Sequence, residues 1–290
     1  MNPIYRTLGI SKQNFHQRLE EKMKKQDEKY QILKLIREVR EDHPAMSPRY
    51  MYKLIQPEYM GRDKFEAFCY ENGFRVRRPK NYRRTTDSRG VTRFDNLLLH
   101  HELTGIAQVL VSDITYYEIG FKFYYLTFIM DLYSRKIKGY SASESLQTIN
   151  TTIPALNMVI KETNEEQLKG TIIHSDGGGQ YYCKEFRKII KQNDMRSSMG
   201  ESVYENAHAE RLNGIIKNSY LKLYNPQNYK ELTKQLKRAV DKYNQEKPHS
   251  ALGDLSPVAF ENSLLLSTEN LFINKRKKVT KKENLTMMVN

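Results

Sequence analysis

The sequence predicts an α/β fold in which a mixed sheet is flanked by helices, with a small helical domain before it and a basic tail after it. Strand and helix signals alternate between residues 106 and 262, as they do in domains that cover a sheet with helices. Residues 1–84 carry helical signals and many cations, and residues 263–290 are rich in Lys. The predicted organisation is a helical, basic region at 1–84, a linker at 85–105, a core at 106–262 and a basic tail at 263–290.

Helical signals dominate the first region. Ser11 is suited to cap a helix, in a pattern typical of the second half of a helix-turn-helix and equally of an ordinary capped helix. A long amphipathic helix follows and is expected to end before Pro44, because proline cannot continue it. The helices expected here cover residues 12–19, 20–40, 47–55 and 63–72.

The core is expected to run strand, strand, strand, helix, strand, helix. Runs of β-branched and aromatic residues predict the strands, and apolar residues at helical spacing predict the helices. The expected strands include residues 109–111, 124–130, 135–140 and 171–173. The expected helices include residues 146–162, 185–193, 206–217 and 229–243. Ile149 and Leu156 are predicted on the buried face of the helix at 146–162.

The composition excludes several classes of protein. The chain has 290 residues, of which 39% are hydrophobic, enough for a sizeable core. No apolar run approaches the length that spans a bilayer, and the first residues lack the apolar region of a signal peptide. Cys69 and Cys183 are too few for a disulfide framework or a cysteine-based zinc site. We therefore expect a cytoplasmic protein.

The formal net charge of +14 is distributed unevenly along the chain. Residues 1–100 carry 22 Lys and Arg against 13 Asp and Glu, residues 101–270 carry 20 of each, and residues 271–290 carry 6 against 1. Basic flanks around a neutral centre suit contact with a phosphate backbone, with chemistry in the middle. The alternative is a generally basic protein with no polyanion partner.

The segment 171–217 carries the strongest chemical signal. A short β-branched run ends at His174, Ser175 and Asp176, and three glycines follow, which would break either a strand or a helix. An Asp is thus placed at a strand end beside permissive backbone. Further along, one face of the helix expected at 206–217 combines a carboxylate, two amides and an ammonium. Its members are Asn206, Glu210, Asn213 and Lys217.

A third acid extends this pattern. The apolar run 109–111 leads directly to Asp113, which is expected on a strand of the same sheet. Asp113, Asp176 and Glu210 would then converge, and their mutual repulsion would require a cation to neutralise it. Oxygen ligands of this kind favour Mg²⁺ or Mn²⁺ over zinc.

Four ordered segments carry a resemblance to a known family. They read VSDITYYEIGFKFYYLTFIMDLYSRKIKGY, HSDGGGQYY, SMGESVYENAHAERLNGIIK and YNQEKPHSALGDLSPVAFE. In this order they resemble the catalytic polypeptide, OrfB, of bacterial insertion-sequence transposases with a retroviral-integrase-like DDE core. The resemblance implies a ribonuclease-H-like mixed sheet, with Asp113, Asp176 and Glu210 as catalytic residues and ligands of two metal ions.

The chain departs from the family pattern before Glu210. Thirty-three residues separate Asp176 from Glu210, fewer than is usual in the family. The shortfall falls in the loop at residues 200–205, ahead of the helix. A deletion at that point leaves Glu210 on the same face of its helix, so the acid is expected to keep its place.

The function expected from the residues and the resemblance is metal-dependent DNA strand cleavage and strand transfer in transposition of an insertion sequence. In two-metal phosphoryl transfer, water as the nucleophile gives cleavage and a DNA 3′ hydroxyl gives joining. Two alternatives are a nuclease or junction resolvase on the same core, and a non-catalytic DNA-binding remnant of a mobile element.

Several residues are predicted to contact DNA. Lys217 is expected to pair with a phosphate, and His174, Gln180 and Asn213 to line the site. A basic segment after residue 70 interleaves cations with aromatic residues, which suits a DNA backbone, although a solvated linker has the same composition. Its cations include Arg77, Arg78, Arg83 and Arg84. His249 is equally suited to a phosphate contact or to a packed C-terminal brace.

The resemblance also implies partners. The first is double-stranded DNA, both as the ends of the element and as the target. The second is further copies of the chain, assembled on that DNA. If the chain does not act alone, a third partner is a DNA-binding protein encoded in an upstream reading frame. The expected location is the bacterial cytoplasm, with association to the nucleoid when DNA is bound.

Overall fold

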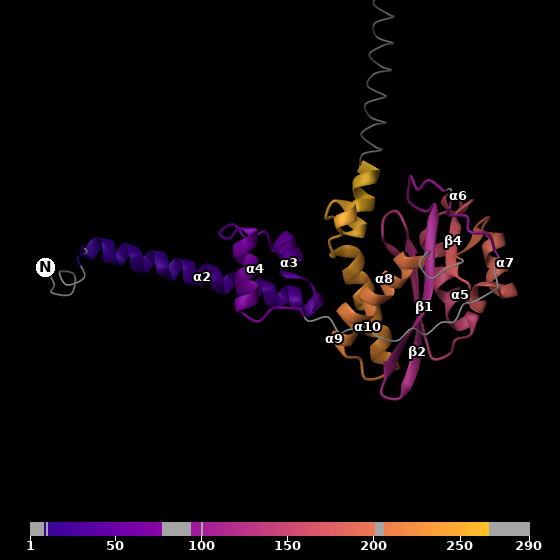
Figure 1. Cartoon of the computed structure of the whole chain (residues 1–290), viewed down its shortest axis with the longest axis horizontal. Helices are drawn as coiled ribbons and strands as arrows, with labels where there is room; N and C mark the ends of the chain where they lie inside the picture. The colour runs from indigo at the N-terminus through magenta and orange to yellow at the C-terminus, as the bar shows by residue number, and fades with distance from the viewer. Residues whose placement is uncertain (1–8, 10, 77–93, 100, 201–205, 267–290) are drawn as a thin grey trace, which may run out of the picture. The chain divides into compact units, whose positions relative to one another are not determined.

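The fold is described from a computed structural model, which describes residues 9, 11–76, 94–99, 101–200 and 206–266 (Figure 1). The chain divides into two compact units, Met1–Arg78 and Pro79–Asn290. The domain boundaries predicted from the sequence stay predictions. Within the described ranges, no helix combines the length and the apolar character needed to cross a membrane.

Within the described residues, the N-terminal unit contains the helices α2 (Lys12–Asp42), α3 (Pro48–Ile55) and α4 (Arg62–Glu71). Ser11 caps α2 as predicted, because its side chain accepts a hydrogen bond from the backbone N–H of Asn14 at 3.1 Å. The helices expected at 12–19 and 20–40 are one continuous helix. Only its C-terminal half is packed, since Ile32 and Ile36 are its buried residues.

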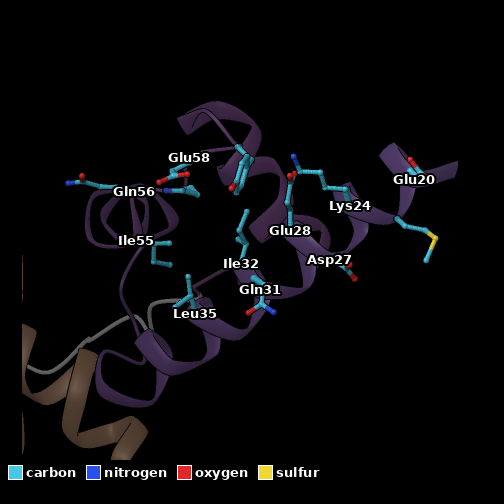
Figure 2. Close-up of a pocket in the computed structure, with 13 residues that line it drawn as sticks. Glu20, Lys24, Asp27, Glu28, Gln31, Ile32, Leu35, Ile55, Gln56 and Glu58 are labelled. Atoms are coloured by element: carbon cyan, nitrogen blue, oxygen red, sulfur yellow. The ribbon is translucent and has the colours of Figure 1, made fainter. Parts of the chain in front are cut away.

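A groove of about 750 Å³ runs between α2 and the segment 55–59 in this unit (Figure 2). Its apolar lining includes Ile32, Leu35 and Ile55. The acidic residues of the lining are Glu20, Asp27, Glu28 and Glu58, and they outnumber its basic residues. The lining of this groove is therefore acidic on balance, in contrast to the basic character of the unit as a whole.

The second unit contains a five-stranded sheet in the order β3-β2-β1-β4-β5. The strands are β1 (Val109–Ile119), β2 (Lys122–Asp131), β3 (Ile137–Ser143), β4 (Ile172–Asp176) and β5 (Arg196–Gly200). The first three form antiparallel pairs, whereas β1, β4 and β5 are parallel. The predicted class, a ribonuclease-H-like mixed sheet flanked by helices, is confirmed.

The strand β5 was not predicted. Its sequence, Arg-Ser-Ser-Met-Gly, lacks the β-branched and aromatic residues that indicate strands. Its pairing comes from β4 on one side and from the segment 94–99 on the other. There, the backbone N–H of Leu97 donates to Ser198 Oγ at 3.0 Å and that of Met199 donates to the carbonyl of Asp95 at 3.4 Å.

Helices cover both faces of the sheet (Figure 1). The longer helices are α5 (Thr152–Glu162), α7 (Lys184–Gln192), α8 (Ala207–Ile215) and α10 (Tyr229–Gln245). Along β1, Leu110 packs with α5 and α7, whereas Val109 and Val111 pack with α8 and α10. This alternation follows because successive side chains along a strand point to opposite faces of the sheet. Shorter elements are η1 (Thr148–Asn150), α6 (Glu165–Leu168), η2 (Gly179–Tyr181), the π-helix η4 (Ile216–Leu221), α9 (Lys222–Tyr224) and η5 (Ser250–Leu252).

The helix predicted at 146–162 begins later than expected. A 3₁₀ turn, η1, precedes it, and Thr151 interrupts the helical backbone with φ −114° and ψ −83°. The Thr151 hydroxyl donates to the carbonyl of Gln147 at 2.9 Å, which closes this turn. Ile149 therefore lies outside α5 and is 65% exposed, so its predicted burial is wrong, whereas Leu156 is buried as predicted.

Gly139 on β3 provides a test of the packing between the sheet and α5. A Cβ atom at this position would overlap the backbone carbonyl of Ala155. We expect Gly139→Ala to lower the free energy of unfolding by about 1–3 kcal/mol, since a backbone neighbour cannot move aside as a flexible side chain can. The measurement is urea unfolding of the full chain.

Gly214→Ala is the matched control, because no atom lies within 4 Å of its Cβ position. This glycine is inside α8, where alanine is expected to stabilise the helix by roughly 0.5–1 kcal/mol. Equal unfolding free energies for the two variants would contradict the close approach of β3 and α5.

Candidate functional site

Asp113 and Asp176 lie side by side on neighbouring parallel strands. The paired residues of β1 and β4 end with Ser112 opposite Ser175, and the two acids follow directly. Asp176 ends β4 as predicted. Asp113 does not end its strand, because β1 continues beyond it as one arm of a long hairpin with β2. The pairing of β1 with β4, in contrast, ends at Ser112, just before this acid.

The α8 helix holds a polar face against β1 beside these acids. Asn206 Nδ2 donates to the carbonyl of Ser112 at 3.0 Å, and Asn213 Nδ2 donates to Asp113 Oδ2 at 2.6 Å. Lys217 Nζ, at the start of η4, donates to Thr115 Oγ1 at 2.6 Å. Glu210 is one turn before Asn213 on the same helix and is exposed. Successive turns of one helix thus follow β1 along its length.

The three carboxylates share a region of negative potential. Burial raises the pKa of Asp113 to about 8, and the negative charges of Asp176 and Glu210 contribute to this rise. The backbone N–H of Ile114 and the ammonium of Lys217 oppose it. Burial also raises the pKa of Asp176, against a hydrogen bond from the backbone of Gly178. Asp176 and Glu210 are therefore close enough to Asp113 to disfavour its ionisation.

The donor set suits a hard divalent cation. Asp113, Asp176 and Glu210 provide only carboxylate oxygens, the ligands that Mg²⁺ and Mn²⁺ prefer. A cation would also relieve the potential that raises the pKa of Asp113. In the part of the chain that the structure describes, however, no three acidic, His or Cys side chains are gathered as a ready-made ion site. Asp113 Oδ2 instead accepts the amide of Asn213.

The three glycines after Asp176 differ in how closely they are packed. A Cβ atom on Gly177 would overlap the methyl group of Met199, and one on Gly178 would lie 3.2 Å from Asp176 Oδ1. Gly179 has no atom within 4 Å of its Cβ position. The loop therefore passes tightly between Asp176 and β5, and the first two glycines allow this path.

The predicted DNA-contacting residues have different surroundings. His174 is fully buried within the sheet, where Nδ1 lies 2.9 Å from Ser198 Oγ, so in this structure it does not reach the surface. Gln180 Nε2 donates to the carbonyl of Leu146 at 3.3 Å. Lys217 is half-buried above the ring of Tyr116, and burial lowers its pKa. The arginines Arg77, Arg78, Arg83 and Arg84 lie outside the described residues.

Sequence reasoning missed Ser112 and Tyr181. Their hydroxyl groups are 2.8 Å apart and buried on the opposite face of the sheet from α8. Burial and the charges of Asp176 and Asp113 raise the pKa of Tyr181 well above its ordinary value. This hydrogen bond joins β1 to the loop after β4, and no spacing in the sequence could have identified it.

Comparison with known proteins gives consistent results. Two family models described as integrase core domain match residues 105–203 and 195–257, together more than half of the chain. The chain is 28% identical over 263 residues to the insertion element IS600 uncharacterized 31 kDa protein of Shigella sonnei, covering 87% of this chain and 95% of that protein. It is 28% identical over 197 residues to the transposase for insertion sequence element IS629 of the same species, covering 67% of this chain and 65% of that protein.

Among solved structures, the HTLV-2 integrase catalytic core domain in complex with magnesium, in its trimeric form, is similar at a TM-score of 0.44. It shares 22% sequence identity over 53% of this chain and 95% of that chain.

Asp113 is expected to make stability depend on pH in metal-free protein. Its folded-state pKa of about 8 is above the ordinary value of 3.8, so the folded state binds this proton more tightly than the unfolded state does. The stability that this group contributes is present below pH 4 and is lost as the pH rises through 8. At pH 8 with a chelator, Asp113→Asn should therefore be more stable than the wild type, by about 1 kcal/mol or more.

Chemical denaturation at several pH values measures this difference, which should disappear toward pH 4. Glu118→Gln, an exposed change on the same strand, controls for the loss of one negative charge and should show no such trend. A pH-independent difference for Asp113→Asn would contradict the proposed environment of this carboxyl group.

Proposed function

The chain belongs to the insertion-sequence transposases that carry an integrase core domain, and we propose that it catalyses DNA strand cleavage and strand transfer during transposition. Membership implies polynucleotidyl transferase activity. The observation that supports the finer assignment is the placement of Asp113 and Asp176 on adjacent strands beneath the helix that carries Glu210. We assign the catalytic role to these three residues.

The cofactor in this proposal is a divalent metal, Mg²⁺ or Mn²⁺, with two ions per site held by Asp113, Asp176 and Glu210. When bound, such ions lower the pKa of a water or a 3′ hydroxyl and neutralise charge on the leaving oxygen. The protein's own contribution is to hold the carboxylates: β1 and β4 fix two of them on rigid strands, and α8 presents the third.

Neighbouring polar groups position these acids. The Asn213 amide orients the Asp113 carboxylate through its 2.6 Å hydrogen bond. Lys217 brings a positive charge toward the same carboxylate while its ammonium is anchored on Thr115. Asn206 secures the first turn of α8 to β1. We expect these groups to keep the acid set in register when DNA and metal bind.

The partners proposed are duplex DNA, as element ends and as target, and further copies of the chain on that DNA. Membership in the family implies DNA binding and assembly into oligomers. Recognition of particular end sequences would involve the basic N-terminal region or a DNA-binding protein from an upstream reading frame. The proposed location is the cytoplasm, at the nucleoid. The nuclease and non-catalytic alternatives are not favoured, because relatives such as that of IS629 are transposases.

A labelled duplex carrying an element end, incubated with Mg²⁺, tests the activity. The wild type should cut and join strands, and Asp113→Asn, Asp176→Asn or Glu210→Gln should lower the rate by at least about 10²–10³-fold, because each removes charge that the transition state requires. DNA binding by the variants should persist. Glu118→Gln, outside the site, should keep full activity.

The products distinguish the alternatives. Cutting without joining by the wild type would identify a nuclease, and binding without either reaction would identify a non-catalytic remnant. Full activity of all three variants would remove these acids from the mechanism.

Metal binding has a readout that is independent of activity. Mg²⁺ should raise the melting temperature of the wild type, since a ligand that binds only the folded state stabilises it by about 2.7 kcal/mol at 100 times its Kd. Glu210→Gln should lose most of this increase, because one anionic ligand is removed. Glu165→Gln, a change on the surface helix α6, should retain it. An equal increase in both variants would place the ion elsewhere.

A further inference from the structure

A second cluster of charged residues lies in the core unit, apart from the three acids. Three segments meet around Tyr243 near the end of α10. The turn between β2 and β3 brings Arg135, the loop after α10 brings Lys247 and His249, and α8 brings His208 and Arg211. Arg135 Nη1 donates to His208 Nδ1 at 3.0 Å. The ring centroids of Tyr243 and His249 are 5.0 Å apart, and Lys247 Nζ is 5.7 Å from the same tyrosine ring.

This cluster uses a different side of α8 from the acid site. Asn206 and Asn213 face β1, as their hydrogen bonds show. His208 and Arg211 are one turn apart on the helix and are both exposed. Residues at this spacing share a face, which is rotated away from the face of Asn206 and Asn213. Arg211 is therefore open to solvent on a face of α8 that is separate from the carboxylates, whereas Arg135 and Lys247 are half-buried.

The two arginines of the cluster form no ion pair with an acid in the part of the chain that the structure describes. Asp131 is fully buried, and its carboxylate accepts the backbone N–H groups of Ala107, Tyr133 and Ser134. Among the residues that the structure describes, Arg135 and Arg211 have no carboxylate within ion-pair distance. Within the described ranges the two guanidinium groups therefore form no ion pair, and the buried carboxylate of Asp131 acts on Arg135 only from a longer distance.

Three groups of the cluster have a lowered pKa. Burial lowers the pKa of Arg135, with a further lowering from the charge of Arg211, whereas the charges of Tyr243 and Asp131 raise it. Burial lowers the pKa of His208, and both arginines add to the effect. The pKa of His249 falls to about 3 through burial and the charges of Lys247, Arg135 and Arg211. Both imidazoles are therefore neutral at pH 7, and the positive charge comes from the three permanent cations.

The backbone fixes Arg135 in this place. Its φ of 62° lies in the left-handed region, where a residue with a side chain is strained. The turn is held by Asp131, whose carbonyl accepts the N–H of Arg135 at 2.9 Å and whose side chain caps the two preceding residues. The hydrogen bonds of Asp131 thus hold the turn in a backbone conformation that glycine would adopt more easily.

We propose that Arg135 and Arg211, with the added charge of Lys247, form a binding site for a phosphate group, and that the phosphate belongs to the DNA backbone. Guanidinium groups bind phosphate oxygens through paired hydrogen bonds, and a convergent set of cations gives such a site its affinity. This assignment rests on the proposed function, which requires duplex DNA on the core. It would position DNA from a surface other than the one that carries the acids.

Salt-dependent DNA binding tests the site. Affinity of the full chain for a duplex of arbitrary sequence is measured by fluorescence anisotropy over a range of salt concentrations, with a chelator present to prevent cleavage. The double variant Arg135→Gln/Arg211→Gln should reduce the slope of log affinity against log salt by about 0.9 for each phosphate that the protein no longer neutralises. Arg211→Gln alone should reduce this slope by a smaller amount. Because it changes only one exposed residue of a helix, it still tests the site if the double variant does not fold.

The matched control is Arg187→Gln/Lys188→Gln, which removes two exposed cations from α7. It should leave the slope unchanged. Equal slopes for the cluster variant and the wild type would overturn the inference, as would an equal reduction in the control. Arg135→Lys/Arg211→Lys, which keeps the charges, should recover most of the wild-type slope.

A second measurement identifies the source of the phosphate. Inorganic phosphate, compared with chloride at equal ionic strength, should raise the melting temperature of the wild type more than that of the cluster variant. If phosphate stabilises the wild type more than the cluster variant while both proteins show the same salt slope for DNA binding, the site binds free phosphate. The assignment to the DNA backbone is then wrong. A wild type that binds the duplex with the expected slopes but neither cuts nor joins it with Mg²⁺ would contradict the proposed function alone.

Discussion

The parallel pairing of β1 with β4 is the constraint on which the candidate site depends. Because this pairing ends at Ser112 and Ser175, two like-charged side chains follow on adjacent strands and on the same face of the sheet. The amide of Asn213, the ammonium of Lys217 and backbone N–H groups oppose the repulsion between them only in part, since the pKa of Asp113 is still raised. The helix α8 is thus part of the electrostatics of the strands as well as a cover for the core.

The two charged regions of the core unit have opposite sign and share one helix. Asn213 of α8 contacts an acid on the sheet, whereas His208 lies against Arg135 in the β2–β3 turn. In the proposals above, each region suits a ligand of the opposite sign. A cation and a phosphate would then lie on different sides of the same helix.

Much of this architecture follows from local sequence patterns. The strand preceding Asp176 and the polar face of residues 206–217 were predictable, because apolar periodicity and glycines mark them directly. The strand β5 was not, since Ser197 and Ser198 are held in it by pairing with neighbours and not by their own hydrophobicity. The burial of His174 and the Ser112–Tyr181 hydrogen bond depend on the register between strands, which a single sequence does not encode locally.

The segment 94–99 has a consequence for where the catalytic unit begins. The matched family region starts at residue 105, yet Asp95 and Leu97 hydrogen-bond to Met199 and Ser198 along the outer side of β5. A fragment trimmed to the family boundary would lose the backbone hydrogen bond from Met199 to Asp95 and the contact of Leu97 with Ser198. Unpaired backbone groups at a strand edge recruit other chains, so a fragment that keeps residues 94–99 retains a backbone partner for this outermost strand.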